Sequence, residues 1–265
     1  KLAKHGNCYV NDAFGAAHRA HASTTQLASF FPNDKMAGLL MNAEIENAKK
    51  VLHEAERPFT AIVGGAKVSD KVLIVENLLQ IANHIIIGGG MAYTFFKAMG
   101  GQIGASLCEE ERVDTCKEIL ARAKTMGVQI HLPVDAIVAD GFAADANTKI
   151  ANSGEIEANW MGLDIGPKAI ETFRAVLLDS KTILWNGPMG VFEMPAFEAG
   201  TKNIAMAVAE ATTNGAFSLI GGGDSAAAVQ QFNLSSKVSY VSTGGGALLE
   251  YFEGKTLPGV QALEA

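Results

Sequence analysis

The sequence predicts an α/β fold with a Rossmann-like parallel β-sheet and helices on both faces. Apolar runs rich in β-branched residues alternate with longer stretches of helical periodicity, which is typical of βα units around a parallel sheet. The apolar runs are nearly continuous, as expected for strands buried on both faces. Glycines gather where these runs end, which places close backbone approaches at one edge of the sheet.

The elements follow this alternation along the chain. Strands are expected at 59–65, 84–90, 129–140, 181–190, 216–223 and 237–246. Amphipathic helices are expected between them at 69–82, 109–127, 166–180 and 197–215, and the second and fourth of these end at a glycine that suits a helix C-terminus.

The first part of the chain is different. Residues 4–27 offer one short strand and a group of polar and basic side chains. Residues 33–56 have an i, i+3, i+4 apolar stripe and predict a single helix. The chain begins with Lys1 rather than methionine, so we expect it to be a fragment, a processed chain or the product of an incomplete reading frame.

Composition limits the possible functions. The chain has 265 residues, 48% of them hydrophobic, and a formal net charge of −7, which favours a globular protein and gives no electrostatic basis for nucleic-acid binding. Cys8, Cys108 and Cys116 lack CxxC spacing, which argues against a disulfide framework or a thiolate zinc site. The apolar runs are too short to cross a bilayer. We expect a cytoplasmic protein that does not bind membranes.

Glycine triplets at 88–90, 221–223 and 244–246 end three of the expected strands. Ligands of open α/β sheets bind outside the carboxyl ends of the strands, where loop backbones and helix N-termini converge. Each triplet alone is explained by a tight turn. Their repetition at equivalent positions favours one shared ligand.

Two lysines follow another glycine pair. In VGGAKVSDK, Lys67 and Lys71 are four residues apart at the start of an expected helix, so both ammonium groups would lie on one face near free N–H donors. This arrangement suits a multiply charged anion. The alternative is an exposed, solvated lysine pair.

An aspartate follows the triplet at 221–223. In GGGDSAAAV, Asp224 is expected at a helix N-cap, where a carboxylate could simply accept backbone N–H bonds. Beside a phosphate site, Asp224 would instead suit Mg²⁺, which nucleotide sites hold through one or two carboxylates together with phosphate oxygens and water. Ser225 would add a hydroxyl and an N–H group.

Several catalytic and cofactor motifs are absent. GGGDSA and GGGMAY lack the last glycine of a dinucleotide-binding fingerprint, so a dehydrogenase-type domain is the weaker alternative. The sequence also lacks the HRD and DFG motifs of protein kinases and the GxSxG elbow of hydrolases.

At this point the motifs resemble a known family. Seven segments, in the family's order and covering nearly the whole chain, are similar to phosphoglycerate kinase. They are VNDAFGAAHRAH (10–21), GGAKVSDK (64–71), GGGMAYTF (88–95), MGLDIGP (161–167), WNGPMGVFE (185–193), GGGDSAAAV (221–229) and VSTGGGALLEYFEGKTLPGV (241–260).

The resemblance implies a role for each phosphate-side residue. Lys67 and Lys71 match lysines that contact the transferred phosphoryl group and the nucleotide phosphates. Asp224 matches the ligand of the Mg²⁺ that accompanies ADP or ATP. The neighbours that match phosphate-binding positions are Gly222, Gly223 and Ser225.

The resemblance also implies a nucleoside pocket and a substrate side. Glu193 matches the acceptor for the ribose hydroxyls, and Gly245 belongs to the loop whose amides face the moving phosphoryl group. Arg19 matches one arginine of the patch that binds the glycerate phosphate. The pocket for the base and its wall match Gly89, Gly90, Gly162, Leu163, Asn186 and Pro188.

The resemblance further implies an organisation and a reaction. Residues 1–32 would be a remnant of the N-terminal substrate domain, 33–56 the interdomain helix, 57–246 the nucleotide-binding domain, and 247–265 a segment that returns toward the N-terminal domain. The family reaction is reversible phosphoryl transfer from 1,3-bisphosphoglycerate to MgADP, which gives 3-phosphoglycerate and ATP in glycolysis.

Matched to the family, the given chain starts at the tail of the N-terminal domain, and the resemblance implies that the rest of that domain supplies most glycerate-binding side chains. We therefore expect a phosphotransferase of low activity when alone. The alternative is a catalytically incompetent module that binds MgADP or MgATP and needs the missing half.

Overall fold

The computed structural model describes residues 1–264. Its helices are α1 (Leu39–Leu52), α2 (Val72–Ile81), α3 (Met91–Ala98), α4 (Val113–Met126), α5 (Pro167–Asp179), α6 (Ala199–Thr213), α7 (Gly223–Gln231), α8 (Gly246–Phe252) and α9 (Pro258–Glu264). Its strands are β1 (Tyr9–Asn11), β2 (Lys35–Ala37), β3 (Phe59–Val63), β4 (His84–Ile87), β5 (Gln102–Ile103), β6 (Gln129–His131), β7 (Asp135–Ala139), β8 (Thr148–Asn152), β9 (Glu155–Ile156), β10 (Met161–Ile165), β11 (Thr182–Asn186), β12 (Phe217–Gly221) and β13 (Tyr240–Val241).

A six-stranded sheet with the order β13-β12-β11-β3-β4-β6 forms the centre of the molecule. Every neighbouring pair in it is parallel. Strand side chains alternate between two cores. Phe59, Ala61 and Val63 of β3 belong to one core with α1, α2, α3, α4 and α8, whereas Ile62 belongs to the other with α5, α6 and α7. The predicted parallel α/β fold is confirmed.

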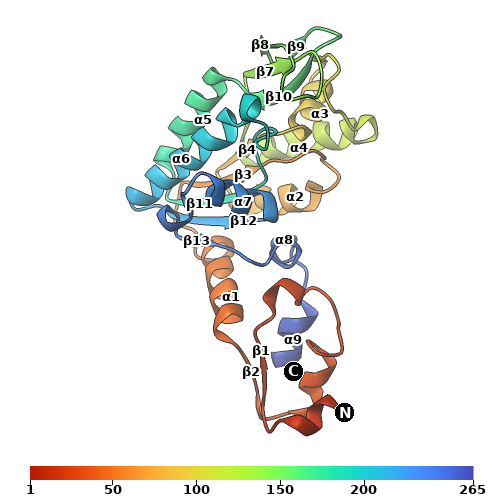
Figure 1. Cartoon of the computed structure of the whole chain (residues 1–265), viewed down its shortest axis with the longest axis vertical. Coiled ribbons are helices and arrows are strands. Elements are labelled where there is room, and N and C mark those ends of the chain that lie inside the picture. Colours follow the sequence, from red (N-terminus) through yellow and green to blue (C-terminus); the bar gives the residue numbers. More distant parts are fainter. Residues whose placement is uncertain (265) are drawn as a thin grey trace.

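Two regions are distinguished below. The sheet body, residues 57–246, contains the parallel sheet and α2 to α7, and α1 and α8 pack against it. The terminal lobe consists of residues 1–37 and of α9, residues 258–264, and it holds both described ends of the chain (Figure 1). Within it, β1 and β2 form a two-stranded parallel sheet, and the Gly259 N–H donates to the Ala17 carbonyl at 2.8 Å. Residue 265, the last of the expected returning segment, lies outside the described residues.

The run 129–140 was predicted as one strand, and this was wrong. β6 belongs to the parallel sheet, while β7 pairs antiparallel with β8 and β10 in a separate three-stranded sheet. The break contains Pro133, which lacks the N–H group that a central strand needs. β5 and β9 form a further short parallel pair that the sequence did not indicate.

The single helix predicted for 33–56 is also shorter than expected. Residues 35–37 pair with β1, and α1 begins only after Gly38. The Asp12 carboxylate replaces a local cap, because its Oδ1 accepts the Met41 N–H at 2.8 Å. Among residues 1–264, no helix is both long enough and apolar enough to span a bilayer.

Candidate functional site

The order in which the chain adds strands to the parallel sheet reverses between β3 and β11. From β3 the chain adds β4 and β6 on one side, and it later adds β12 and β13 beyond β11 on the other side. Such a switch point leaves a crevice outside the carboxyl ends of its two central strands. The loops that border this crevice are 64–71 after β3 and 187–190 after β11.

The backbones of these two loops touch. The Gly64 N–H donates to the Asn186 carbonyl at 2.9 Å, and the Gly65 N–H donates to the Pro188 carbonyl at 3.2 Å. A β-carbon on Gly64 would lie 2.1 Å from the Pro188 carbonyl oxygen, and one on Gly187 would lie 2.1 Å from the Gly64 oxygen. The glycines are therefore required by this contact.

A cavity of about 690 Å³ opens at the switch point. Its lining includes seven residues predicted for the site, namely Gly89, Gly90, Gly162, Leu163, Pro188, Glu193 and Asp224. The other lining side chains are mainly apolar, and sequence reasoning missed them: Tyr93, Leu107, Phe142, Met189, Val191 and Met194. Met189, Val191 and Met194 come from the loop after β11, and the other three come from α3 and from two separate loops. Those within quoted motifs were not assigned a role. An apolar slot with two exposed carboxylates suits a partly apolar, planar ligand with a polar end.

The wall glycines have structural reasons of their own. A β-carbon on Gly162 would lie 1.7 Å from the Tyr93 hydroxyl oxygen. Gly89 has a φ of +68°, and its β-carbon would lie 2.5 Å from the Gly65 oxygen. Turn geometry and packing thus account for these glycines individually, while their convergence on one cavity is what the ligand hypothesis requires.

The lysines lie in the loop ahead of α2 rather than on a helix face. α2 begins at Val72, with Lys71 as its N-cap residue, so the predicted helical placement of the pair was wrong. Lys67 is exposed. The Lys71 Nζ is half-buried and donates to the Asn186 Oδ1. Burial lowers the pKa of Lys71, and the charge of Asp224 is the largest of the influences that oppose this shift.

The start of α7 brings the remaining phosphate-side residues together. Gly222 is the N-cap residue, with φ +87°, and Asp224 is in the first turn, so the prediction of Asp224 as N-cap was wrong. A β-carbon on Gly222 would lie 2.9 Å from the Asn186 Nδ2, whereas one on Gly223 would meet nothing within 4 Å. Ser225 is fully buried, and its Oγ accepts the Gly187 N–H at 2.6 Å.

The loop with the third glycine triplet lies outside the cavity lining. Gly245, with φ +49°, is the N-cap residue of α8. A buried carboxylate of α1 holds this loop, because Glu44 accepts hydrogen bonds from the Ser242 hydroxyl at 2.6 Å and from the Thr243 N–H and hydroxyl at 2.7 and 2.8 Å. No sequence motif indicated Glu44.

Arg19 belongs to the terminal lobe and is exposed. Its Nε donates to the His18 Nε2 at 3.3 Å. The His18 ring lies 3.6 Å from where a β-carbon on Gly246 would be. Arg19 is therefore near the start of α8 and away from the cavity lining.

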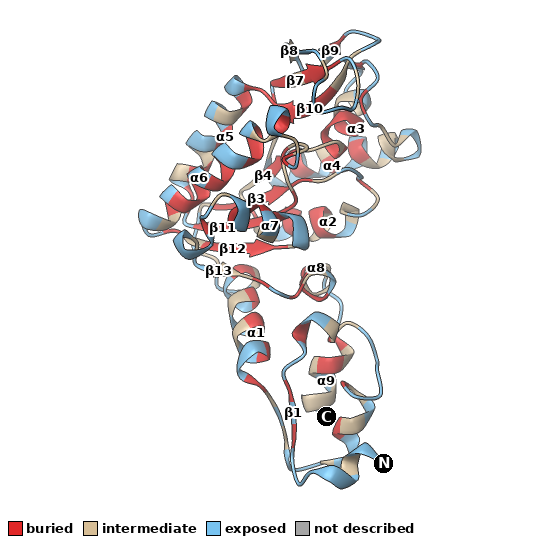
Figure 2. Cartoon of the chain, viewed as in Figure 1, coloured by how far each residue is buried: buried red, intermediate tan, exposed pale blue. Residues whose placement is uncertain are grey.

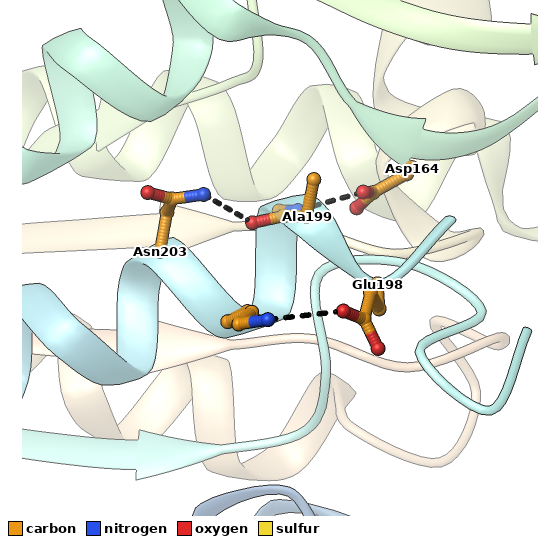
Figure 3. A network of polar contacts seen from close by, with 6 residues as sticks. Asp164, Glu198, Ala199 and Asn203 are labelled. Atoms are coloured by element: carbon orange, nitrogen blue, oxygen red, sulfur yellow. Dashed lines mark hydrogen bonds and ion pairs between the residues drawn. The ribbon is translucent and has the colours of Figure 1, made fainter. Parts of the chain in front are cut away.

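Asp164 also borders the cavity, but its carboxylate binds backbone (Figure 3). Its oxygens accept the Gly200 N–H at 2.7 Å and the Ile165 N–H at 2.9 Å. Burial raises the pKa of Asp164 to about 7, against the effect of these two donors. Asp164 thus fixes the start of α6 against the cavity wall. A single aspartate within an apolar run gave no sequence signal for this role.

Comparisons with known proteins agree with this architecture. A family model described as phosphoglycerate kinase matches residues 1–255. A phosphoglycerate kinase of Porphyromonas gingivalis is 57% identical over 265 residues, which are 100% of this chain and 63% of that protein. The chain therefore spans less than two thirds of the length of this relative.

Solved structures give the same result. The structure of phosphoglycerate kinase from Coxiella burnetii matches with a TM-score of 0.94 and 43% identity, over 99% of this chain and 67% of that chain. The crystal structure of phosphoglycerate kinase from Pyrococcus horikoshii OT3 matches with a TM-score of 0.84 and 32% identity, over 100% of this chain and 65% of that chain. The chain therefore belongs to the phosphoglycerate kinase family.

Proposed function

We propose that this chain binds ADP or ATP with Mg²⁺ in the cavity between β3 and β11. The observation that carries the proposal is the grouping at this switch point of an apolar slot, the Lys71 ammonium, the Asp224 carboxylate and the open start of α7. Base and ribose would occupy the slot, with Gly89, Gly90, Gly162, Leu163 and Pro188 as walls and Glu193 accepting from the ribose hydroxyls. Phe142 and Leu107 would add apolar contact.

The phosphates would extend toward Lys67, Lys71 and α7. The missing side chain at Gly223 leaves room for phosphate oxygens at a helix N-terminus, whose free N–H groups favour anions. Asn186 would orient the Lys71 ammonium. Gly222 and Ser225 would shape the α7 turn, since Ser225 binds the Gly187 backbone.

The residues present also fit Mg²⁺. Asp224 is exposed at the cavity and supplies one carboxylate, the number that Mg²⁺ often takes from a protein when phosphate oxygens and water complete its shell. When bound, Mg²⁺ would neutralise phosphate charge during transfer.

We further propose that the complete protein transfers the acyl phosphate of 1,3-bisphosphoglycerate to MgADP, giving 3-phosphoglycerate and ATP. Charge develops mainly on the oxygens of the transferred group in such reactions. Lys67, Lys71 and the amides around Gly245 would stabilise that charge electrostatically, because the fold holds them in place before transfer begins. In this direction a β-phosphate oxygen of ADP accepts the phosphoryl group and the carboxylate of 3-phosphoglycerate leaves. In the reverse direction that carboxylate is the acceptor. The proposed setting is glycolysis in the cytoplasm.

Arg19 is the only residue of this chain that we assign to the glycerate phosphate. We propose that the family's N-terminal domain supplies the rest of that site and that the chain alone has low activity. Holding two reactants in line contributes about 7–11 kcal/mol in well-oriented systems, and most of this is lost when one reactant has no site.

Two measurements test these proposals. Calorimetry should detect binding of MgADP, and no binding at millimolar nucleotide by the folded chain would refute the nucleotide site. ATP formation from 1,3-bisphosphoglycerate should be slow with the chain alone and should rise when a family N-terminal domain is added. MgADP binding with no turnover by the chain alone, and turnover only after that addition, would identify an incompetent binding module that needs the missing half.

A further inference from the structure

A segment between β5 and α4 crosses one side of the cavity and joins three of its walls. The Ala105 N–H donates to the Trp160 carbonyl at 2.8 Å, and the Ser106 hydroxyl accepts the Gly162 N–H at 3.0 Å. Leu107 lines the cavity beside Gly90. Two residues later, Glu109 contacts the loop of residues 64–71, which carries Lys67 and Lys71 and is called the lysine loop below.

Glu109 holds the middle of that loop with both carboxylate oxygens. Its Oε2 accepts the Ser69 N–H at 3.0 Å, and its Oε1 accepts the Ser69 hydroxyl at 2.6 Å. Glu109 is itself fixed, because its N–H donates to the hydroxyl of the buried Thr94 at 3.2 Å. Ser69 lies midway between Lys67 and Lys71 in the sequence, so this clamp is two residues from each ammonium-bearing residue.

The charges around Glu109 favour the clamp. Burial acts to raise the pKa of Glu109, but the hydrogen bonds from Ser69 and the charge of Lys67 outweigh it and hold the pKa below its usual range. The carboxylate is therefore ionised at neutral pH, and hydrogen bonds to a charged acceptor are the stronger kind.

The rest of the loop is held at its two ends. Gly65 donates to the Pro188 carbonyl at one end, and Lys71 donates to Asn186 at the other. Residues 66–70 between them carry Lys67, whose side chain is exposed. The Glu109 clamp and the buried Val68 are what fix this middle part.

We propose that Glu109 is a positioning residue for the phosphate end of the site: by clamping Ser69 it fixes the loop that presents Lys67 and Lys71. The inference rests on the proposed nucleotide function. The proposed role concerns only the phosphate end of the ligand, because other contacts of the same segment build the slot for the base. Loss of the clamp should weaken binding of a phosphorylated ligand and leave a bare nucleoside nearly unaffected.

The test compares MgADP with adenosine for a set of variants. Glu109→Ala should weaken MgADP binding about tenfold, equivalent to the loss of one charge-assisted hydrogen bond, and should leave adenosine affinity within about twofold. Ser69→Ala should show a smaller effect of the same kind. Glu109→Gln should retain most of the affinity, because its amide oxygen can still accept the Ser69 N–H.

Glu110→Ala is the matched control. Glu110 is the adjacent residue with the same side chain, and it is exposed, with an ion pair to Lys97 at 3.7 Å and a hydrogen bond to Cys108. Its replacement should leave MgADP binding unchanged. Amide exchange at residues 67–70, measured without nucleotide, should accelerate in Glu109→Ala and not in Glu110→Ala.

The outcomes are distinguishable. Equal weakening of MgADP and adenosine in Glu109→Ala would overturn the positioning role in favour of general structural damage. A Gln variant as weak as the Ala variant would show that charge rather than the clamp matters, and would also overturn it. If the unsubstituted chain bound no nucleotide, the proposed function itself would fall, while the exchange data would still report whether the clamp holds the loop.

Discussion

The sheet body and the terminal lobe differ in how completely their strands are covered (Figure 2). All residues of β3 and β11 are buried, because helices pack on both faces of the parallel sheet. In the terminal lobe, Val10 of β1 is 52% exposed and Met36 of β2 is 50% exposed. A two-stranded sheet is marginal on its own. The sheet body thus has a core of its own, whereas residues 1–37 of the terminal lobe depend on contacts with α9 and with α8.

Removing one aromatic ring from each region, a buried one from the sheet body and an exposed one from the terminal lobe, should give the largest difference in stability. Phe173 of α5 is 0% exposed within the core of the sheet body, and Phe30 of the terminal lobe is 68% exposed. Phe173→Ala should lower the free energy of unfolding by about 3–5 kcal/mol, while Phe30→Ala should change it by about 0.5 kcal/mol or less. Urea unfolding measures both. Similar losses of unfolding free energy in the two variants would contradict the difference in burial between the two regions.

The contact between Glu44 of α1 and the loop of residues 242–246 should give the next largest effect on stability. Glu44→Ala leaves the Ser242 and Thr243 donors without their buried acceptor, at a cost of about 2 kcal/mol. Amide exchange at 243–246 should also accelerate. Glu46→Ala, on the exposed side of the same helix, is the control. Equal stability of the two variants would show that Glu44 is not what holds the loop.

A smaller effect is expected where the terminal lobe caps α1. Asp12→Ala removes the acceptor of the Met41 N–H and should cost about 1 kcal/mol, the usual value of an N-cap. Asp12→Asn keeps an oxygen acceptor and should recover most of it. Thermal unfolding of both variants checks this. A fully stable Ala variant would show that the terminal lobe does not support α1 through this bond.

The smallest expected effect is on the pH dependence of stability, and it comes from His131 in the sheet body. Burial, and then the neighbouring His84, lower the pKa of His131, whose Nε2 is 3.0 Å from the His84 Nδ1. Because the folded pKa is the lower one, the contribution of His131 to stability is present above its unfolded pKa of about 6.5 and is lost as pH falls below it. Unfolding measured from pH 7.5 to 5 should be less pH-dependent in His131→Asn. The exposed His53→Asn should retain the full dependence.

Patterns repeated along the chain could be predicted from the sequence. The apolar runs that became β3, β4, β11 and β12 gave the parallel sheet, and glycines after them indicated the edge at which the cavity lies. Single residues that act across the fold could not be predicted. Glu44 bonds to Ser242 and Thr243, nearly two hundred positions later, and only the packing of α1 on the sheet body brings them together.

Local errors had local physical causes. The run 129–140 contained enough β-branched residues to predict one strand, but Pro133 breaks the ladder and sends β7 to another sheet. Residues 35–37 continue the i, i+3, i+4 apolar pattern of α1, but they form β2 because they pair with β1. The lysine spacing suggested a helix face, but the loop is held by contacts at Gly65 and Ser69 and becomes helical only at Val72.

The contact of Gly64 with Gly187 also limits how this protein can change during evolution. Each position is occupied by the backbone of the other loop, so even alanine, the smallest alternative, would collide at 2.1 Å. Gly187 is restricted further by its φ of +102°. A replacement at one position cannot be accommodated by trimming a side chain at the other, because no side chain is there. In a library of all single substitutions, both positions should tolerate none, whereas the open Gly223 should lose ligand affinity before it loses the fold.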